Sequence, residues 1–262
     1  MRPNKMRTIW QDGGYVVNGW LMVPNSVATE VMAHQGWDSL TVDMQHGLID
    51  YADAIPMLTA IATTDAAPVV RVPWLEPGIL MKVLDAGAQA VICPMINTAE
   101  EAERLISATH YPPRGTRSFG PVRAALYAGP DYHKHANNNV VTFAMIETRQ
   151  GLDNLEDILK VDGLEAVFVG PSDLSLALGC EALFDEVEKP AAEAIEYIAA
   201  KCKEHKVIAG IFNSSPEAAL QRVKMGYQFV TIASDVGMLT AGSQRALAAA
   251  GKGKAAAAKD GY

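Results

Sequence analysis

The sequence predicts a (β/α)₈ barrel, also called a TIM barrel, and three observations lead to this fold class. Eight short, nearly continuous apolar runs occur along the chain, as expected for parallel strands that are covered on both faces. Helix-like segments separate most of these runs, and such alternation indicates repeated βαβ units. The length of 262 residues suits a barrel of this kind. We therefore expect one barrel domain that spans residues 1–262.

Each expected element follows from its own local pattern. The strands are the apolar runs at residues 16–21, 39–43, 69–72, 90–93, 140–146, 166–169, 207–212 and 229–233. The helix-like segments lie at residues 51–63, 78–85, 98–108, 152–159, 186–205 and 216–225. A doubly wound open sheet is the main alternative fold. No G-x-G-x-x-G motif follows the first strand, however, so the usual dinucleotide reason for that fold is missing.

Two further segments fit neither pattern. Residues 111–139 are rich in Pro, Gly and Arg and are expected to form one long irregular stretch. A loop of this length in a compact domain is usually functional or part of an interface. The tail, residues 251–262, repeats Lys and Ala and is expected to be a flexible, frayed end.

The composition argues against several classes of protein. A formal net charge of −8 argues against nucleic acid as a partner, because phosphate binding needs clustered Lys and Arg. No apolar run approaches the length of a membrane span, and the start of the chain lacks the apolar core of a signal peptide. The three cysteines form no CxxC motif, which favours free thiols in a reducing compartment. We expect a cytoplasmic protein without a membrane partner.

Two acidic residues, Glu147 and Asp173, follow successive predicted strands. A carboxylate at the end of a buried strand is costly to desolvate unless it is paired, hydrogen-bonded or bound to a metal. In a parallel barrel both acids would lie at the same mouth, where barrel enzymes have their active sites. Two carboxylates without a neighbouring His or Cys favour a hard divalent cation such as Mg²⁺. The alternative is an ion pair with Arg149 or Arg71.

Three other strand-end residues have the chemistry of a catalytic site. His46 lies three residues after Asp43, which could orient it as a general base; the alternative is a solvent-facing loop histidine. Arg71 lies inside an apolar run, where an arginine is rarely unpaired, and its guanidinium suits a carboxylate or an enolate oxygen. A structural pair with Asp43 or Glu147 is compatible with that role.

The segment 170–175 reads as a tight turn that opens into a short helix, whose free N–H groups could hold a substrate carboxylate. A Schiff-base aldolase would need an inward-pointing lysine on a strand. The lysines of this chain fall on predicted helices or at their ends, so an imine mechanism is not expected.

Several strings, in order along residues 19–239, carry a family resemblance. They are Asp43-Met44-Gln45-His46-Gly47, Val70-Arg71-Val72, Asp85-Ala86-Gly87-Ala88-Gln89, Pro94-Met95-Ile96-Asn97-Thr98, Tyr111-Pro112-Pro113-Arg114-Gly115, Met145-Ile146-Glu147-Thr148-Arg149 and Val169-Gly170-Pro171-Ser172-Asp173-Leu174. Together they resemble the HpcH/HpaI family of metal-dependent (class II) pyruvate aldolases. That family includes 4-hydroxy-2-oxoheptanedioate and 2-keto-3-deoxy sugar-acid aldolases. The string from Arg117 to Arg123 is similar to the branch of hydroxy-ketoacid or hydroxypyruvate aldolases.

The resemblance implies a metal site and a carboxylate site. Glu147 and Asp173 would bind the divalent metal, usually Mg²⁺, Mn²⁺ or Co²⁺. Pyruvate would chelate this metal through its keto and carboxylate oxygens. The backbone N–H groups of Ser172 and Asp173 would hold the carboxylate.

The resemblance also implies the groups that move charge and protons. Arg71 would stabilise the enolate oxygen and the developing alkoxide. His46 would transfer protons with Asp43, assisted by Asp85 from a neighbouring subunit. The family further implies that the last helix is swapped between partners, which gives dimers that assemble into hexamers as trimers of dimers.

Other positions concern the aldehyde. Phe212 matches a hydrophobic family position that limits the aldehyde pocket, and Arg123 could help to set aldehyde choice. Trp20 lies in Gly19-Trp20-Leu21, where some relatives have Gly-Leu-Trp, and this departure could reshape the same pocket. Met145 stands where several relatives have Gln. Both departures bear on substrate choice more than on activity.

The function that this sequence predicts is a class II aldolase, a carbon–carbon lyase. It would reversibly cleave a 4-hydroxy-2-oxo acid into pyruvate, or hydroxypyruvate, and an aldehyde by way of a metal-stabilised enolate. Its expected setting is aromatic or sugar-acid catabolism. Two alternatives are a CoA-ester lyase of the citrate lyase β or malyl-CoA type, and a non-catalytic barrel that binds a 2-oxo acid.

Overall fold

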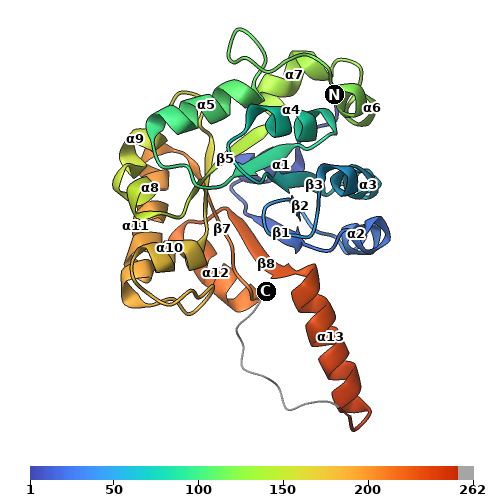
Figure 1. The fold of residues 1–262 in the computed structure, drawn as a ribbon, viewed down its shortest axis with the longest axis vertical. Coiled ribbons are helices and arrows are strands. Elements are labelled where there is room, and N and C mark those ends of the chain that lie inside the picture. The colour runs from blue at the N-terminus through green and yellow to red at the C-terminus, as the bar shows by residue number, and fades with distance from the viewer. Residues whose placement is uncertain (253–262) are drawn as a thin grey trace.

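The protein folds into a closed barrel of eight parallel strands that follow one another in chain order, as the sequence predicts (Figure 1). A computed structural model describes residues 1–252, so the predicted frayed tail lies almost entirely outside the described residues. The strands are β1 (Val16–Leu21), β2 (Ser39–Asp43), β3 (Ala67–Arg71), β4 (Ala90–Cys93), β5 (Val141–Ile146), β6 (Ala166–Val169), β7 (Ile208–Ile211) and β8 (Phe229–Ser234). The predicted strands match these bounds to within two residues.

Helices surround the barrel and connect its strands (Figure 1). The helices of the first half are α1 (Lys5–Gln11), α2 (Ser26–Ala33), α3 (Tyr51–Ile61), α4 (Pro77–Asp85), α5 (Ala99–Thr109), α6 (Val122–Ala128) and α7 (Tyr132–Asn139). Those of the second half are α8 (Arg149–Asp153), α9 (Leu155–Leu159), α10 (Pro171–Ala177), α11 (Lys189–His205), α12 (Pro216–Met225) and α13 (Asp235–Ala249). Among the described residues, no helix is long and apolar enough to cross a membrane.

The strands are apolar on both faces because each face lies against a different core. On β3, Val70 belongs to the outer core between strands and helices, whereas Val69 belongs to the core inside the barrel. Aromatic rings fill the inside: Phe143 packs against Phe168 with ring centroids 6.4 Å apart, and Trp20 stacks on Phe168 at 5.7 Å. Burying these large rings removes much apolar surface from water, which stabilises the barrel.

The prediction of one irregular stretch at residues 111–139 was wrong. The stretch contains α6 and α7, two short helices that enclose a small core of their own made by Tyr111, Ala124, Ala128, Tyr132 and Ala136. Short helices among Pro and Gly residues lack a long apolar periodicity, so the sequence pattern did not reveal them. The helix predicted at 152–159 is likewise two helices, α8 and α9, that meet at Asn154.

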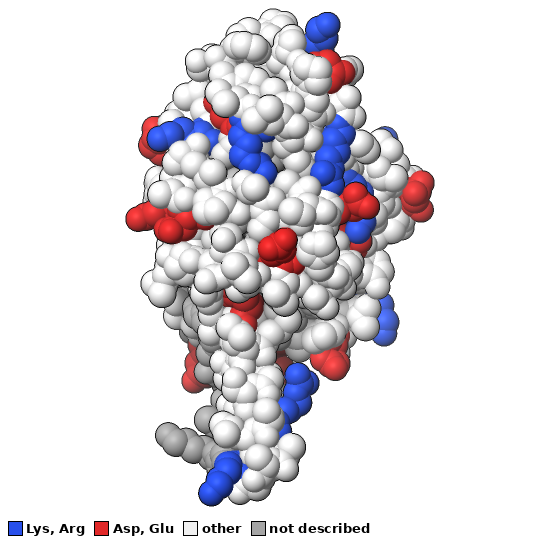
Figure 2. All heavy atoms as spheres, turned by 90° about the vertical axis from the view of Figure 1, so that its right-hand side faces the viewer, with Lys and Arg blue, Asp and Glu red and all other residues white. Residues whose placement is uncertain are grey.

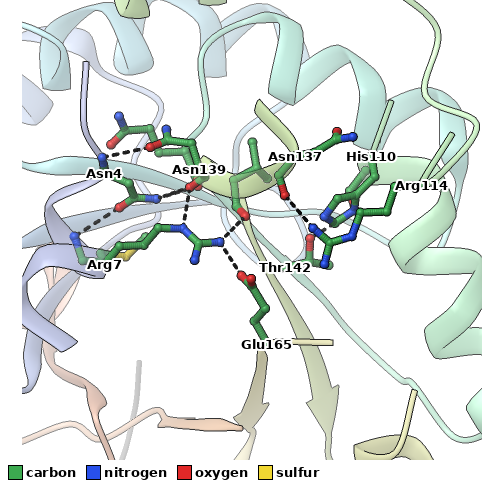
Figure 3. A network of polar contacts seen from close by, with 12 residues as sticks. Asn4, Arg7, His110, Arg114, Asn137, Asn139, Thr142 and Glu165 are labelled. Carbon is green, nitrogen blue, oxygen red and sulfur yellow. Dashed lines mark hydrogen bonds and ion pairs between the residues drawn. The ribbon is translucent and has the colours of Figure 1, made fainter. Parts of the chain in front are cut away.

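Helix α1 closes the end of the barrel that lies opposite the carboxyl ends of the strands. Its N-cap residue, Asn4, donates from Nδ2 to the carbonyls of Gln89 at 3.1 Å and Asn139 at 2.9 Å, which precede β4 and β5 (Figure 3). Arg7 donates to the carbonyl of Asn139 and is paired with Glu165 (Figure 3). These bonds join α1 to the starts of three strands, so α1 is held firmly against the end of the barrel.

Helix α13 extends away from the barrel body (Figure 1). Within residues 1–252 it packs at its base, next to β1 and β8, and Asp235 is its one buried residue. Leu239 and Leu247 are 60% and 50% exposed, and most of the helix surface is uncharged (Figure 2). The predicted exchange of this helix between partners concerns a second chain and stays a prediction here.

We predict that Asn4→Asp lowers the free energy of unfolding by about 2 kcal/mol, because a buried donor is replaced by an oxygen that faces two carbonyl oxygens. The control is Asn25→Asp at the exposed N-cap of α2, where the side chain only accepts a bond, from Ala28 N–H. Asn and Asp are nearly equal as N-caps, so this variant should be neutral. Urea unfolding measures both values, and equal effects would contradict the role assigned to Nδ2.

Candidate active site

A buried ion pair links the carboxyl ends of β2 and β3. The register of these strands places Asp43 beside Arg71. Arg71 donates from Nε to Asp43 Oδ1 at 2.8 Å and from Nη2 to Oδ2 at 2.6 Å. Two parallel charge-assisted bonds of this kind fix both side chains in one geometry. Among residues 1–252, Nη1 of Arg71 has no hydrogen-bond partner, so this donor is free to bind an oxygen of a ligand.

Trp20, at the mouth end of β1, supports the ion pair. Its indole Nε1 donates to Asp43 Oδ2 at 3.2 Å, and the Arg71 guanidinium lies 4.8 Å from the centre of its ring. Burial alone would favour the neutral form of Asp43. The hydrogen bonds and charge of Arg71, with the Trp20 bond, outweigh burial and hold the pKa of this carboxyl below its usual value. Asp43 is therefore a permanently charged anchor rather than a group that titrates near neutrality.

Glu147 follows β5 and is 2% exposed. Its Oε1 accepts a 2.9 Å bond from the backbone N–H of Met95, whereas its Oε2 has no donor among the described residues. Burial, together with the charge of Asp173, raises the pKa of Glu147 to about 7, against the opposing effects of the Met95 bond and Arg71. A buried carboxylate with one unsatisfied oxygen is a natural ligand for a cation.

The donor to Glu147 depends on an unusual backbone turn that the sequence pattern did not reveal. Met95 has a φ of +58°, a left-handed conformation that is rare for residues other than Gly and Asn. Asn97 donates from Nδ2 to the Met95 carbonyl at 2.7 Å and accepts a bond from Thr148, the neighbour of Glu147. Asn97 thus connects two segments, the turn at Met95 that donates to Glu147 and the chain directly after Glu147.

Gly170 leaves room beside Glu147. A Cβ atom at this position would lie 2.6 Å from Glu147 Oε2 and 2.6 Å from Met145 Cε. Such contacts are far below any normal separation, so no other residue fits here without moving the carboxylate. Gly170 is also the N-cap of α10, and it provides no side-chain cap.

The first turn of α10 presents the second acid and two free donors. Asp173 is exposed and lies in the first turn of α10, two residues after Pro171. Among residues 1–252, the backbone N–H groups of Ser172 and Asp173 have no partner. Unpaired N–H groups at a helix start favour an anion.

The donor set fits a hard cation that keeps several open positions. Asp173 lies close enough to Glu147 for its charge to contribute to the raised pKa of Glu147, after the larger effect of burial. No cluster of three or more His, Cys, Asp or Glu side chains suited to a metal occurs within the described part of the chain. A pair of carboxylates is nevertheless sufficient for Mg²⁺, which commonly takes one or two from the protein and fills its octahedron with water and substrate oxygens.

The spacing of His46 from Asp43 predicted a contact between the carboxylate and the imidazole ring, whereas the structure shows a contact with the His46 backbone. Asp43 Oδ1 accepts a bond from the backbone N–H of His46 at 3.3 Å, and both oxygens of that carboxylate are already used by Arg71. The His46 residue is exposed, and its ring has no hydrogen-bond partner within residues 1–252. Asp43 therefore holds the loop that carries His46 by its backbone, and orientation of the His46 ring by Asp43, directly or through water, stays a prediction.

Two predicted site residues lie elsewhere in the chain. Asp85, at the end of α4, is paired with the buried Arg117 at 2.7 Å. Arg123 donates to the carbonyl of Leu58 on α3 and to that of Ala86, the residue that follows α4. Neither residue is brought to the Glu147 site within one chain, because Asp85 is paired with Arg117 and Arg123 is bonded to the outer ring of the barrel. Phe212, by contrast, lies at the mouth after β7, with its ring 5.3 Å from that of Trp20.

The chain is similar to known proteins over most of its length. The model of the family described as HpcH/HpaI aldolase/citrate lyase matches residues 19–241. A hydroxypyruvate/pyruvate aldolase of Rhizorhabdus wittichii is 43% identical over 94% of this chain and 98% of its own length. A 5-keto-4-deoxy-D-glucarate aldolase of Citrobacter koseri is 35% identical over 93% of this chain and 95% of that protein. The crystal structure of a protein of the same family from Burkholderia cenocepacia superimposes with a TM-score of 0.88 at 33% identity, covering 95% of this chain and 100% of that one.

The raised pKa of Glu147 predicts a pH-dependent stability for the metal-free protein. Between pH 4.5 and about 7, the folded state keeps a proton that the unfolded state has released, so the contribution of this group falls as pH rises through that window. The shift corresponds to a loss of about 3 kcal/mol, at 1.36 kcal/mol per pKa unit. Above pH 7, Glu147→Gln should therefore be more stable than the parent chain in EDTA.

The measurement is urea unfolding of both proteins in EDTA from pH 5 to pH 8. Glu103→Gln, at an exposed position of α5, is the matched control and should follow the parent chain at every pH. If the curves of Glu147→Gln and the parent chain stay parallel, Glu147 does not titrate as assigned.

Proposed function

Because the chain belongs to the HpcH/HpaI aldolase/citrate lyase family, we propose that it is a divalent-metal-dependent aldolase. Its reaction is the reversible cleavage of a 4-hydroxy-2-oxo acid into pyruvate, or hydroxypyruvate, and an aldehyde. The observation that carries this proposal is the arrangement at the mouth. A buried carboxylate with a free oxygen, Glu147 Oε2, shares the strand ends with a guanidinium that has a free donor, Arg71 Nη1.

The metal would be held by Glu147 and Asp173, and Mg²⁺ or Mn²⁺ fits the all-oxygen donor set, with Co²⁺ as a further candidate. When bound, such a cation acts as a Lewis acid that polarises the keto group of the substrate. The carboxylate of the substrate would accept hydrogen bonds from the free N–H groups of Ser172 and Asp173 at the start of α10.

Arg71 stabilises the negative charge of the reaction. Breaking the C3–C4 bond leaves the pyruvate fragment as an enolate, with charge on the former keto oxygen. A preorganised donor placed where charge develops lowers the barrier, because it needs no reorganisation during the step. Asp43 and Trp20 hold the guanidinium in place for that purpose.

His46 removes the proton from the C4 hydroxyl group during cleavage and returns it during addition. An imidazole is suited to this role because its ordinary pKa lies near neutrality. The ring is exposed and has no partner in the described part of the chain, so it can reach a substrate hydroxyl or a bridging water. No lysine lies on any of the eight strands, which argues against an imine mechanism.

The choice of substrate follows the relatives. A hydroxypyruvate/pyruvate aldolase and 5-keto-4-deoxy-D-glucarate aldolases are similar over nearly the whole chain, and both names describe aldol chemistry. Pyruvate or hydroxypyruvate is therefore the proposed nucleophile. The aldehyde partner is limited by Trp20 and Phe212 at the mouth.

We also propose a homo-oligomer, a hexamer built as a trimer of dimers. Helix α13 supports an oligomer because it projects from the barrel with Leu239 and Leu247 exposed, and an isolated helix of this kind needs a partner surface. Asp85, and Arg123 with it, could reach the site of a neighbouring subunit. Multi-angle light scattering should give about six times the chain mass of 28.1 kDa, and a monomer would refute the assembly.

The decisive test is pyruvate release from 4-hydroxy-2-oxo acids in EDTA and after metal is restored. Activity should vanish with EDTA and return with Mg²⁺ or Mn²⁺, and Glu147→Ala should abolish it. His46→Ala should lower kcat by ~10²–10⁴-fold, the usual loss for a general base. Exposed His135 on α7 provides the matched variant, His135→Ala, which should keep full activity.

Three results would refute the proposal. They are activity that survives chelation, inactivation by borohydride in the presence of pyruvate, and unchanged activity in both Glu147→Ala and His46→Ala. Malyl-CoA assayed in parallel separates the aldolase from a CoA-ester lyase. Only the lyase would cleave the carbon–carbon bond of malyl-CoA and release a shorter CoA thioester.

A further inference from the structure

The loop between α10 and α11 carries an aromatic residue at the mouth that the proposed mechanism does not use. Phe184 packs against the core inside the barrel, and its ring centroid lies 5.1 Å from that of Phe212. Phe212 in turn packs against Trp20, which donates to Asp43. Phe184 thus extends a row of rings from the buried ion pair to the rim of the barrel.

The chain is tied down on both sides of Phe184. On one side, Ser172 Oγ donates to the carbonyl of Leu183 at 3.3 Å. On the other side, both oxygens of Asp185 accept bonds from Ser214, Oδ1 from the backbone N–H and Oδ2 from the hydroxyl, each at 2.8 Å. A loop without such bonds would be free to move. These bonds restrain the chain on both sides of Phe184, whose ring lies against that of Phe212.

The two bonds between Asp185 and Ser214 form a clamp, that is, a two-point contact between the loop and the chain after β7. Ser214 follows β7, two residues after Phe212, so the clamp joins the loop to the strand end that carries the other ring. Arg222, which is buried on α12, adds a bond to the Asp185 carbonyl at 3.3 Å. Ser172 also belongs to the turn proposed to hold the substrate carboxylate. The loop therefore contacts the carboxylate-binding turn at one point and the aldehyde side at another.

We propose that Phe184 is a specificity-determining residue that limits the size of the aldehyde, and that Asp185 is the positioning residue that holds it. This inference rests on the proposed aldolase function. The two rings form a wall at the β6–β7 side of the mouth, where an aldehyde must approach the pyruvate carbon. A wall made of two large apolar side chains excludes bulky aldehydes and disfavours charged ones, because it offers no hydrogen-bond partner.

The test uses the full-length protein with Mg²⁺ and two readouts. The first is kcat/KM for addition of pyruvate to acetaldehyde and to benzaldehyde. The second is exchange of the pyruvate methyl protons with D₂O, followed by NMR without any aldehyde, which reports the pyruvate half of the reaction alone. Phe184→Ala should raise the benzaldehyde-to-acetaldehyde ratio by about tenfold or more, while methyl exchange stays within about twofold of the parent.

Asp185→Ala should relax the same ratio, and amide hydrogen exchange in residues 178–188 should become faster. Asp185→Asn keeps one acceptor oxygen and should restore part of the selectivity. Asp162→Ala, at an exposed site before β6 and away from the mouth, is the matched control and should change nothing.

The outcomes separate the two claims. If the parent chain exchanges pyruvate protons but Phe184→Ala leaves the aldehyde ratio unchanged, the inference is wrong and the aldolase function stands. A parallel fall of methyl exchange and both additions would also overturn it, since the loop would then support the whole site. If the parent chain shows neither exchange nor addition, the proposed function fails and the inference falls with it.

Discussion

The buried pair of Asp43 and Arg71 is the interaction on which the mouth of the barrel depends. Taking both charges out of water is costly, and the cost is offset only by good geometry and by additional bonds. Here the pair is bidentate, and Trp20 supplies a further donor and a ring face. Removing one partner would leave an uncompensated charge in the core. Arg71 can therefore present a free donor without being free to move.

The two ends of the barrel use polar residues in different ways. At the closed end, Asn4 and Arg7 donate to the backbone carbonyls that precede β4 and β5, although Nδ2 of Asn139 is buried there without a partner among the described residues. At the mouth, Glu147 and Arg71 each keep one unsatisfied atom. These two atoms belong to oppositely charged groups at the carboxyl ends of the strands, so together they can bind a cation and an anionic oxygen of a ligand. Their position supports the mouth as the active site without reference to any relative.

The barrel and the acid pair were predictable from the sequence because both depend on local pattern. Continuous apolar runs identify parallel strands, and an acid directly after such a run lies at the mouth. The left-handed turn at Met95 was not predictable, since methionine has no preference for it, and α6 and α7 were too short to show a period. The contact between Asp185 and Ser214 joins residues 29 positions apart, and no local signal reports such a pair. Local sequence patterns thus predict the strands of the barrel and the charged residues at their ends. The shape of the pocket depends on contacts between residues that are far apart in the sequence.

The packed interior also has a kinetic consequence. The rings of Phe143 and Phe168 pack in the core inside the barrel, and α1 is bonded to the starts of the strands at the end opposite the mouth. The site is therefore approached from the mouth, and two substrates must share that approach. The 2-oxo acid would lie deepest, against Glu147 and Arg71, and the aldehyde would lie above it near Phe212. Addition then requires an ordered sequence in which the acid enters first, and in cleavage the aldehyde departs before the acid can leave.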